Sequence, residues 1–106
     1  MQYESIGKYI RKYRKERRLR QEDLGNRTNL STNYIGMIER GEKIPSLESL
    51  LLIANALEVS ADNLLCDVLD VGYQIKHSQL DEKLSKLSKN ERMMIYDVVD
   101  TLLRHI

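Results

Sequence analysis

Positively charged side chains are concentrated at the amino-terminal end of this 106-residue chain. Residues 1–20 carry a net charge of +6, whereas the whole chain carries only +1. Their eight cations are Lys8, Arg11, Lys12, Arg14, Lys15, Arg17, Arg18 and Arg20. Such a cluster can bind a polyanion such as nucleic acid, although a run of charges is more often the solvated face of a helix. The charge pattern therefore needs a second observation before it indicates a ligand.

The residue types that perform catalysis or bind metals are too sparse to predict a site. The chain has one cysteine, Cys66, and two histidines, His77 and His105. One cysteine can form neither an internal disulfide nor a zinc site, and its neighbours Leu64 and Leu65 favour a buried apolar role. There is no glycine-rich phosphate loop and no recognisable catalytic pattern. We therefore expect no enzymatic activity, no metal and no cofactor.

The composition favours an all-helical protein of ordinary domain size. Apolar residues make up 42% of the chain, and there are only one proline and five glycines. Leu, Ile, Glu, Lys and Arg are abundant, which suits helices better than a turn-rich sheet protein. The longest apolar run has five residues, whereas a membrane span takes about 20. Because the amino terminus also lacks the apolar stretch of a secretory signal, we expect a cytoplasmic protein with no membrane partner.

Helical periodicity and capping residues predict five helices within residues 1–66. Ser31, Ser46 and Ser60 each precede an apolar periodic segment and can accept a hydrogen bond from a backbone N–H of its first turn. Gly41 supplies the left-handed conformation that ends a helix. The expected helices cover residues 5–18, 21–28, 32–40, 47–57 and 61–65.

The helical periodicity of apolar residues is interrupted after Cys66. Apolar and polar residues alternate between Val71 and Lys76, which predicts either a linker or a short strand over residues 67–78 and does not decide between them. Two helices are expected in residues 79–106. Three leucines at helical spacing mark the first, and Ser88 with Glu91 forms a capping box for the second.

Several short segments follow one another in an order that is informative as a whole. They are Leu19-Arg20-Gln21-Glu22-Asp23-Leu24-Gly25, Leu30-Ser31, Ile35, Ile38-Glu39-Arg40-Gly41, Pro45-Ser46-Leu47 and Ala54-Asn55-Ala56-Leu57-Glu58-Val59-Ser60. Over residues 5–65 this pattern resembles the helix-turn-helix regulators of the phage Cro and repressor family. It is similar to the small SinR-like bacterial repressors, which also carry a short helical tail. The resemblance implies a five-helix, lambda-repressor-like DNA-binding domain in residues 1–66, whose third helix enters the major groove.

The resemblance assigns base contacts to the outward face of that third helix. Ile35 and Ile38 supply the apolar inward side that holds such a helix against its domain. The residues left to face outward are Ser31, Thr32, Asn33, Gly36 and Met37. An amide such as Asn33 can bind adenine through two hydrogen bonds, and a threonine or methionine can touch a thymine methyl. The alternative interpretation is a plain solvated helix face.

The resemblance also implies contacts with the DNA backbone. Gln21 matches the family position where a side-chain amide and a helix N-terminus together bind a phosphate. Arg40 and Lys43 follow the third helix and are expected to bind phosphates as well, and Arg20 adds a cation beside the DNA. Tyr34 has two interpretations, with its ring packed on the first helix or its hydroxyl on a phosphate, and we favour the phosphate.

Two further positions match an internal ion pair of the family, Arg14 with Glu39, so we expect these residues to be structural. Three positions depart from the family pattern. Arg20 replaces the usual Ser, Thr or Asn cap, at a cost of about 1 kcal/mol. Gly25 replaces the usual alanine, and Asn29 replaces the usual glycine of the turn, for which asparagine is the next best residue.

The last helix carries a broad apolar face, formed by Ile95, Val98, Val99, Leu102, Leu103 and Ile106. Because the first five helices already close a core, this face is expected to be a dimerisation surface, and the family pairs two domains about a twofold axis. We therefore expect a homodimeric repressor on a palindromic operator in double-stranded DNA, with an antagonist protein as another candidate partner for the tail. The alternatives are a tail folded back on its own domain, a helical protein-interaction adaptor, or an antitoxin component.

Overall fold

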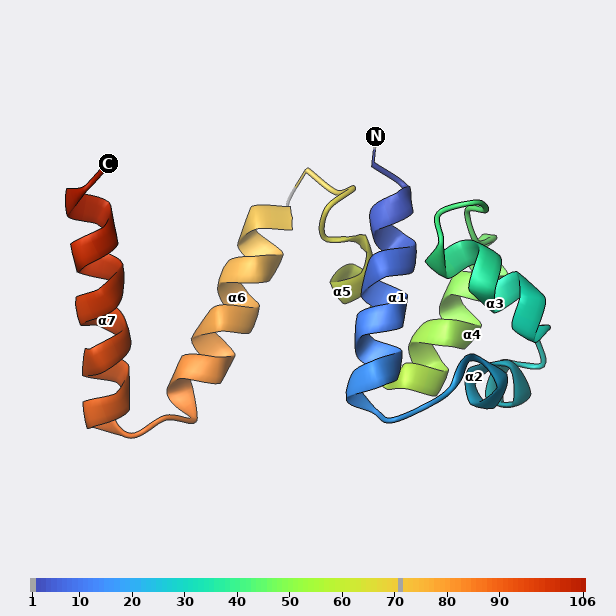
Figure 1. Ribbon diagram of the computed structural model, residues 1–106, viewed down its shortest axis with the longest axis horizontal. Coiled ribbons are helices and arrows are strands. Elements are labelled where there is room, and N and C mark those ends of the chain that lie inside the picture. Colours follow the sequence, from blue (N-terminus) through green and yellow to red (C-terminus); the bar gives the residue numbers. More distant parts are fainter. Residues whose placement is uncertain (1, 71) are drawn as a thin grey trace. The chain divides into compact units, whose positions relative to one another are not determined.

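The computed structural model describes residues 2–70 and 72–106, and every regular element within them is a helix (Figure 1). The elements are α1 (Glu4–Glu16), α2 (Gln21–Thr28), α3 (Thr32–Glu39), α4 (Leu47–Leu57), α5 (Ala61–Leu65), α6 (Gly72–Ser85) and α7 (Lys89–Arg104). The expected all-helical fold is confirmed. The chain divides into two compact units, an amino-terminal unit that ends at Ile75 and a carboxy-terminal unit that begins at Lys76.

Three helices of the amino-terminal unit, α3, α4 and α5, begin directly after the serines that the sequence indicates. The hydroxyl of Ser31 accepts a hydrogen bond from the Tyr34 N–H at 3.0 Å, and that of Ser46 accepts one from the Ser49 N–H at 3.1 Å. Ser60 caps α5 in the same way. Each hydroxyl satisfies one of the backbone N–H groups that a helix leaves without a partner in its first turn.

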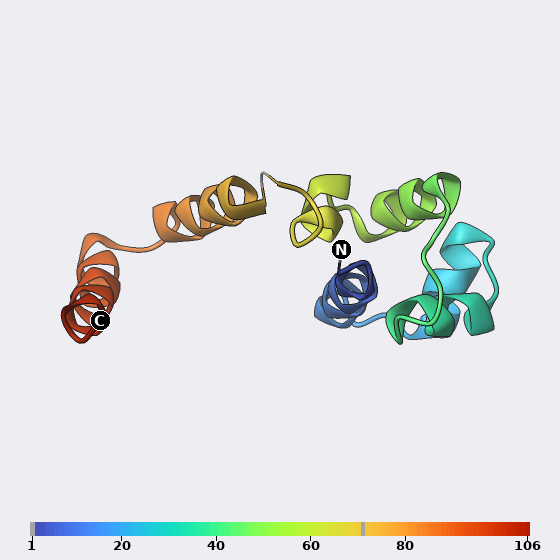
Figure 2. The same cartoon turned by 90° about the horizontal axis from the view of Figure 1, so that it is seen from above.

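An aliphatic core holds α1 to α5 together. α1 lies between α5 on one side and α3 on the other, and α2 packs against both α3 and α4 (Figure 2). The buried apolar residues of this core are Ile6, Ile10, Leu24, Ile35, Ile38, Leu50, Ile53, Ala54, Leu57 and Leu64. Burying one such large side chain contributes about 1.5–3 kcal/mol. The core therefore holds α3 at a fixed orientation within the unit.

The crossing of α1 and α3 depends on a glycine that the sequence pattern does not single out. A β-carbon on Gly7 would overlap the backbone carbonyl of Ile38. No side chain can be accommodated there unless the two helices move apart, because backbone atoms cannot rotate away as a side chain can. Gly7 thus sets how closely α3 sits on α1.

The expectation of a linker or strand over residues 67–78 is wrong for most of that segment. Residues 67–70 form turns, and α6 begins at Gly72, whose N–H donates to the Leu69 carbonyl at 3.0 Å. Val71, part of the alternating pattern, lies outside the described residues. A lone strand has no neighbour to satisfy its backbone groups, whereas a helix satisfies its own. Three apolar residues in alternation are therefore too weak a signal to decide the conformation.

The carboxy-terminal unit contains the rest of α6 and all of α7. The capping box expected for α7 is present, since the Ser88 hydroxyl accepts from the Glu91 N–H at 3.2 Å and the Glu91 carboxylate accepts from the Ser88 N–H at 3.0 Å. This bonding lowers the pKa of Glu91. Within the described residues, no helix is both long enough and apolar enough to cross a membrane.

Candidate nucleic-acid interface

Helices α2 and α3 are joined by a tight three-residue turn. Asn29 occupies the left-handed region at φ 60°, and the Leu30 N–H donates to the Gly25 carbonyl at 3.2 Å. A β-carbon on Gly25 would lie 2.8 Å from the Leu30 carbonyl oxygen. The two departures from the family pattern at positions 25 and 29 are therefore compatible with one another, because the small residue leaves room for the turn that asparagine adopts.

The inward and outward faces of α3 are the expected ones at most positions. Ile35 and Ile38 are fully buried, while Thr32 and Asn33 are exposed together with the cap Ser31. Met37 is half-buried, and its sulfur accepts a weak hydrogen bond from the Asn33 amide at 3.7 Å. The first turn of α3 thus presents polar side chains to solvent, while the opposite side of the helix packs against the core.

Gly36 does not face outward as the sequence analysis expects. It is buried, because the side chains of two neighbours cover it. A β-carbon on Gly36 would lie 2.9 Å from an Arg40 guanidinium nitrogen and 3.4 Å from the Gln21 amide oxygen. The missing side chain is what allows Gln21 and Arg40 to fold over α3 at this point, so Gly36 makes room for two polar side chains and is covered by them.

The expected phosphate contact of Tyr34 is not supported by its hydrogen bonds. Its hydroxyl donates to the Ser49 hydroxyl at 3.2 Å and accepts from the Ser46 N–H at 3.4 Å. Its ring packs against the core. Tyr34 therefore ties α3 to the first turn of α4, and its ring packs against a core that includes Ile6 and Ile10 of α1, in line with the first of the two interpretations offered from the sequence.

A buried ion pair joins α1 to α3. The Arg14 guanidinium donates to both carboxylate oxygens of Glu39, at 2.7 and 2.9 Å, and to the Leu19 carbonyl at 2.8 Å. The Gln21 amide donates to the same carboxylate at 3.2 Å. This is the pair that the family resemblance implies, and it links the amino-terminal end of α2 and the loop before it to α3. Because each charge has several partners, its burial is compensated.

Arg20 precedes α2 and cannot accept the hydrogen bond that a serine cap accepts. Instead the Asp23 carboxylate accepts from the Arg20 N–H at 2.8 Å, and from the guanidinium at 3.2 and 3.1 Å. These bonds from Arg20 hold the pKa of Asp23 below its ordinary value. The Arg20 side chain remains 75% exposed, so its charge still faces solvent beside the start of α2.

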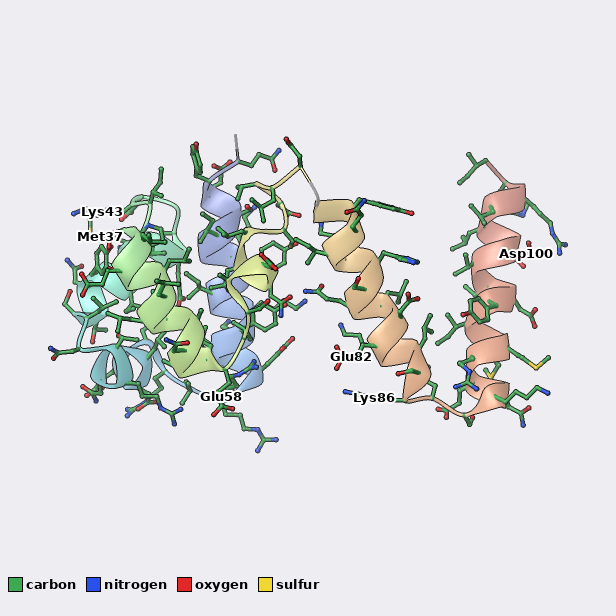
Figure 3. All side chains as sticks on the ribbon, turned by 180° about the vertical axis from the view of Figure 1, so that it is seen from behind. Met37, Lys43, Glu58, Glu82, Lys86 and Asp100 are labelled. Atoms are coloured by element: carbon green, nitrogen blue, oxygen red, sulfur yellow. The ribbon has the colours of Figure 1, made fainter. Side chains whose placement is uncertain are left out.

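The loop after α3 presents two cations. The guanidinium of Arg40 donates to the Glu42 carboxylate at 3.2 and 3.1 Å, which lowers the pKa of Glu42. The backbone N–H groups of Glu42 and Lys43 donate to the Met37 carbonyl at 2.9 and 3.4 Å. Lys43 therefore lies next to Met37, as Figure 3 shows. The sequence analysis does not predict that Glu42 pairs with Arg40. The signal that could have indicated this pair is a carboxylate two residues after the arginine.

The comparisons with known proteins agree with this geometry. A helix-turn-helix family model matches residues 10–64. The chain belongs to the helix-turn-helix family. The immunity repressor protein of Bacillus phage phi105 is 42% identical over 55 residues, which cover 52% of this chain and 38% of that protein. The control protein C.SmaI of Serratia marcescens is 37% identical over 62 residues, 58% of this chain and 74% of that one. The match thus spans well under half of the phage repressor.

Solved structures give the same result. The restriction-modification controller protein C.AhdI from Aeromonas hydrophila is 32% identical with a TM-score of 0.57, over 58% of this chain and 94% of that one. The P22 c2 repressor, solved in complex with a synthetic operator, is 39% identical with a TM-score of 0.54, over 56% and 89%. A complex of SinR with SinI matches at 26% identity and a TM-score of 0.56, over 93% and 98%. The resemblance inferred from the sequence is confirmed.

Proposed function

We propose that this regulator binds a palindromic operator as a homodimer and acts as a repressor, with α3 of each protomer in the major groove. The observation that carries the proposal is the exposed polar first turn of α3, held by a buried apolar side and flanked by cations. Polar side chains on the first turn of a recognition helix are what base edges require. The similarity to the P22 c2 repressor in its operator complex supports this docking.

The contacts divide into base reading and backbone binding. Ser31, Thr32, Asn33 and Met37 read bases, since their side chains face outward or half outward. Gln21, Arg20, Arg40 and Lys43 bind phosphates, which fixes the register without adding sequence preference. Gly36 is not among the base-reading residues because Gln21 and Arg40 cover it. Tyr34 is not among the phosphate-binding residues because its hydroxyl is hydrogen-bonded within the amino-terminal unit.

The homodimer rests on α7, which has no buried residue. Of the six apolar residues assigned to this face, Ile95 is the least exposed at 37%, and the others range from 45% for Val99 to 100% for Ile106, which lies beyond the end of α7. Covering each of these side chains is worth about 1.5–3 kcal/mol at full burial. Pairing two chains through this face would join two recognition helices in one molecule, and a palindromic operator with half-sites about 34 Å apart requires two such helices. Because the SinR–SinI complex matches 93% of this chain, the same face is also a candidate for an antagonist protein.

Sedimentation and a gel shift with the full-length chain test the proposal. The probe is the duplex upstream of the protein's own gene. We expect a dimer, a specific shift, and a slope of log K against log salt near −7 for roughly eight phosphate contacts. Leu102→Asp should give a monomer that binds more weakly. Thr101→Asp adds the same charge on the polar side of α7 and should remain dimeric. A monomeric wild type, or a slope shallower than about −2, would contradict the proposal.

A further inference from the structure

The surface of the amino-terminal unit is hollowed where α1, α2 and α3 meet. This hollow has a volume of about 260 Å³ and is lined by Arg11, Arg14, Gln21, Glu39 and Arg40. Gln21 stands at the start of α2, where the helix dipole and unbonded N–H groups favour an anion. Three guanidinium groups and one carboxylate line the hollow, so it has an excess of positive charge.

The charges of this hollow are not all available to a ligand. Arg14 is bonded to Glu39 through two hydrogen bonds, and Arg40 is paired with Glu42. Among residues 2–70 and 72–106, the exposed side chain of Arg11 makes no hydrogen bond or ion pair. The excess charge therefore resides on Arg11, a guanidinium whose planar fork matches two phosphate oxygens.

A second hollow continues from the first along α1. It has a volume of about 380 Å³ and is lined by Lys8, Arg11, Lys12, Lys15 and Glu39. Its four cations follow one another at spacings of three, one and three residues, which places them on one face of the helix. Ile6 and Ile10 are buried on the opposite side. The positive charge of the amino-terminal segment is thus a continuous stripe that begins beside Gln21.

We propose that Arg11 binds a backbone phosphate of DNA in the hollow beside Gln21, and that the lysines of α1 bind the phosphates that follow. This proposal rests on the proposed function, because it places the strand that α2 contacts along the basic face of α1. The ligand is a phosphodiester chain. Since phosphates carry no sequence information, these contacts add affinity equally to operator and to random DNA.

Fluorescence anisotropy of the full-length chain with a random-sequence duplex tests the role of Arg11. Arg11→Ala should weaken binding about tenfold, the lower end of what a hydrogen bond to a charged group provides. The slope of log K against log salt should become shallower by about 0.9 for each phosphate that the variant no longer neutralises. Arg11→Lys should keep the slope, because it keeps the charge. Lys83→Ala, which removes one charge from α6, should change neither quantity.

An operator duplex, on which the protein has one register, locates the phosphate that Arg11 binds when one of its phosphates is replaced by a neutral methylphosphonate. In a series of duplexes, the neutral group occupies a different position along the strand in each. At one position it should weaken DNA binding by the wild type and leave DNA binding by Arg11→Ala unchanged. Equal binding and equal slopes for Arg11→Ala and Lys83→Ala would overturn the proposal and leave the proposed function intact. Absence of binding by the wild type to any duplex at low salt would overturn both. Calorimetric binding of inorganic phosphate that requires Arg11, with unchanged DNA affinity, would make the hollow a free-anion site and also overturn it.

Discussion

The guanidinium of Arg40 and the carboxylate of Glu42 lie 3.1 Å apart at the end of α3. Arg40 is expected at a DNA phosphate, so a phosphate and Glu42 compete for the same hydrogen-bond donors. In the proposed complex the carboxylate is also a negative charge that approaches the DNA. We therefore expect Glu42 to weaken the binding that Arg40 provides.

Glu42→Gln should therefore strengthen DNA binding, by roughly twofold to fivefold given the strength of exposed ion pairs. The gain should shrink as salt rises, because both effects are electrostatic. Binding of a random duplex by anisotropy measures it. Glu58→Gln removes the same charge at the other end of the amino-terminal unit from Lys43 (Figure 3) and serves as the control. Weaker binding by Glu42→Gln would show that Glu42 helps to orient Arg40 toward DNA.

Removal of Arg14 should destabilise the protein without altering which bases it prefers. Arg14→Ala leaves the Glu39 carboxylate buried without its main partner, which costs about 3–5 kcal/mol. The double variant Arg14→Met with Glu39→Leu should recover most of that stability, since it removes both charges. Urea unfolding of the three proteins measures these differences. If Arg14→Ala lowers the free energy of unfolding by less than about 1 kcal/mol, the value of an exposed ion pair, water reaches the Glu39 carboxylate and the account of a buried pair is wrong.

Glu58 ends α4 in the left-handed conformation, at φ 57°. The β-carbon of an L-residue costs about 1–2 kcal/mol there, and glycine avoids that cost. Glu58→Gly should raise the free energy of unfolding by about 1 kcal/mol, measured by urea titration. Asn29→Gly, at φ 60°, should gain less because asparagine tolerates this region. Destabilisation by Glu58→Gly would refute this explanation.

The bonds between Arg20 and Asp23 make stability depend on pH. The Arg20 side chain, and then its backbone N–H, lower the pKa of Asp23 in the folded protein. The stabilisation is therefore complete above the unfolded pKa, about 3.9, and is lost as pH falls through the lower folded value. Wild type should melt above Asp23→Asn at neutral pH, and the two melting temperatures should converge in acid. A difference that stays constant with pH would contradict this assignment.

Much of the fold could be predicted from local signals. Ser31, Ser46 and Ser60 mark helix starts because a cap is satisfied by residues only three positions away, and Asn29 and Gly41 mark turns because few residues adopt positive φ. The family pattern adds the Arg14–Glu39 pair.

The remaining features depend on contacts between distant residues. The burial of Gly36 follows from Gln21, which lies 15 residues earlier, and the hydroxyl of Tyr34 bonds to α4. Both outcomes are decided by tertiary packing and not by local preference. The helix that begins at Gly72 has another cause, because a helix satisfies its own backbone groups whereas a strand needs a neighbouring strand.

Selection of duplexes from a random pool tests most directly whether α3 reads bases within a dimer. The wild type should enrich an inverted repeat whose half-sites are centred about 10–10.5 base pairs apart. Asn33→Ala should keep that spacing but lose the preference at one base pair in each half-site, worth about 1–3 kcal/mol. Lys43→Ala should enrich the wild-type sequence with lower affinity. Enrichment of the same sequence by Asn33→Ala, or of no repeat by the wild type, would contradict base reading by α3 within a dimer.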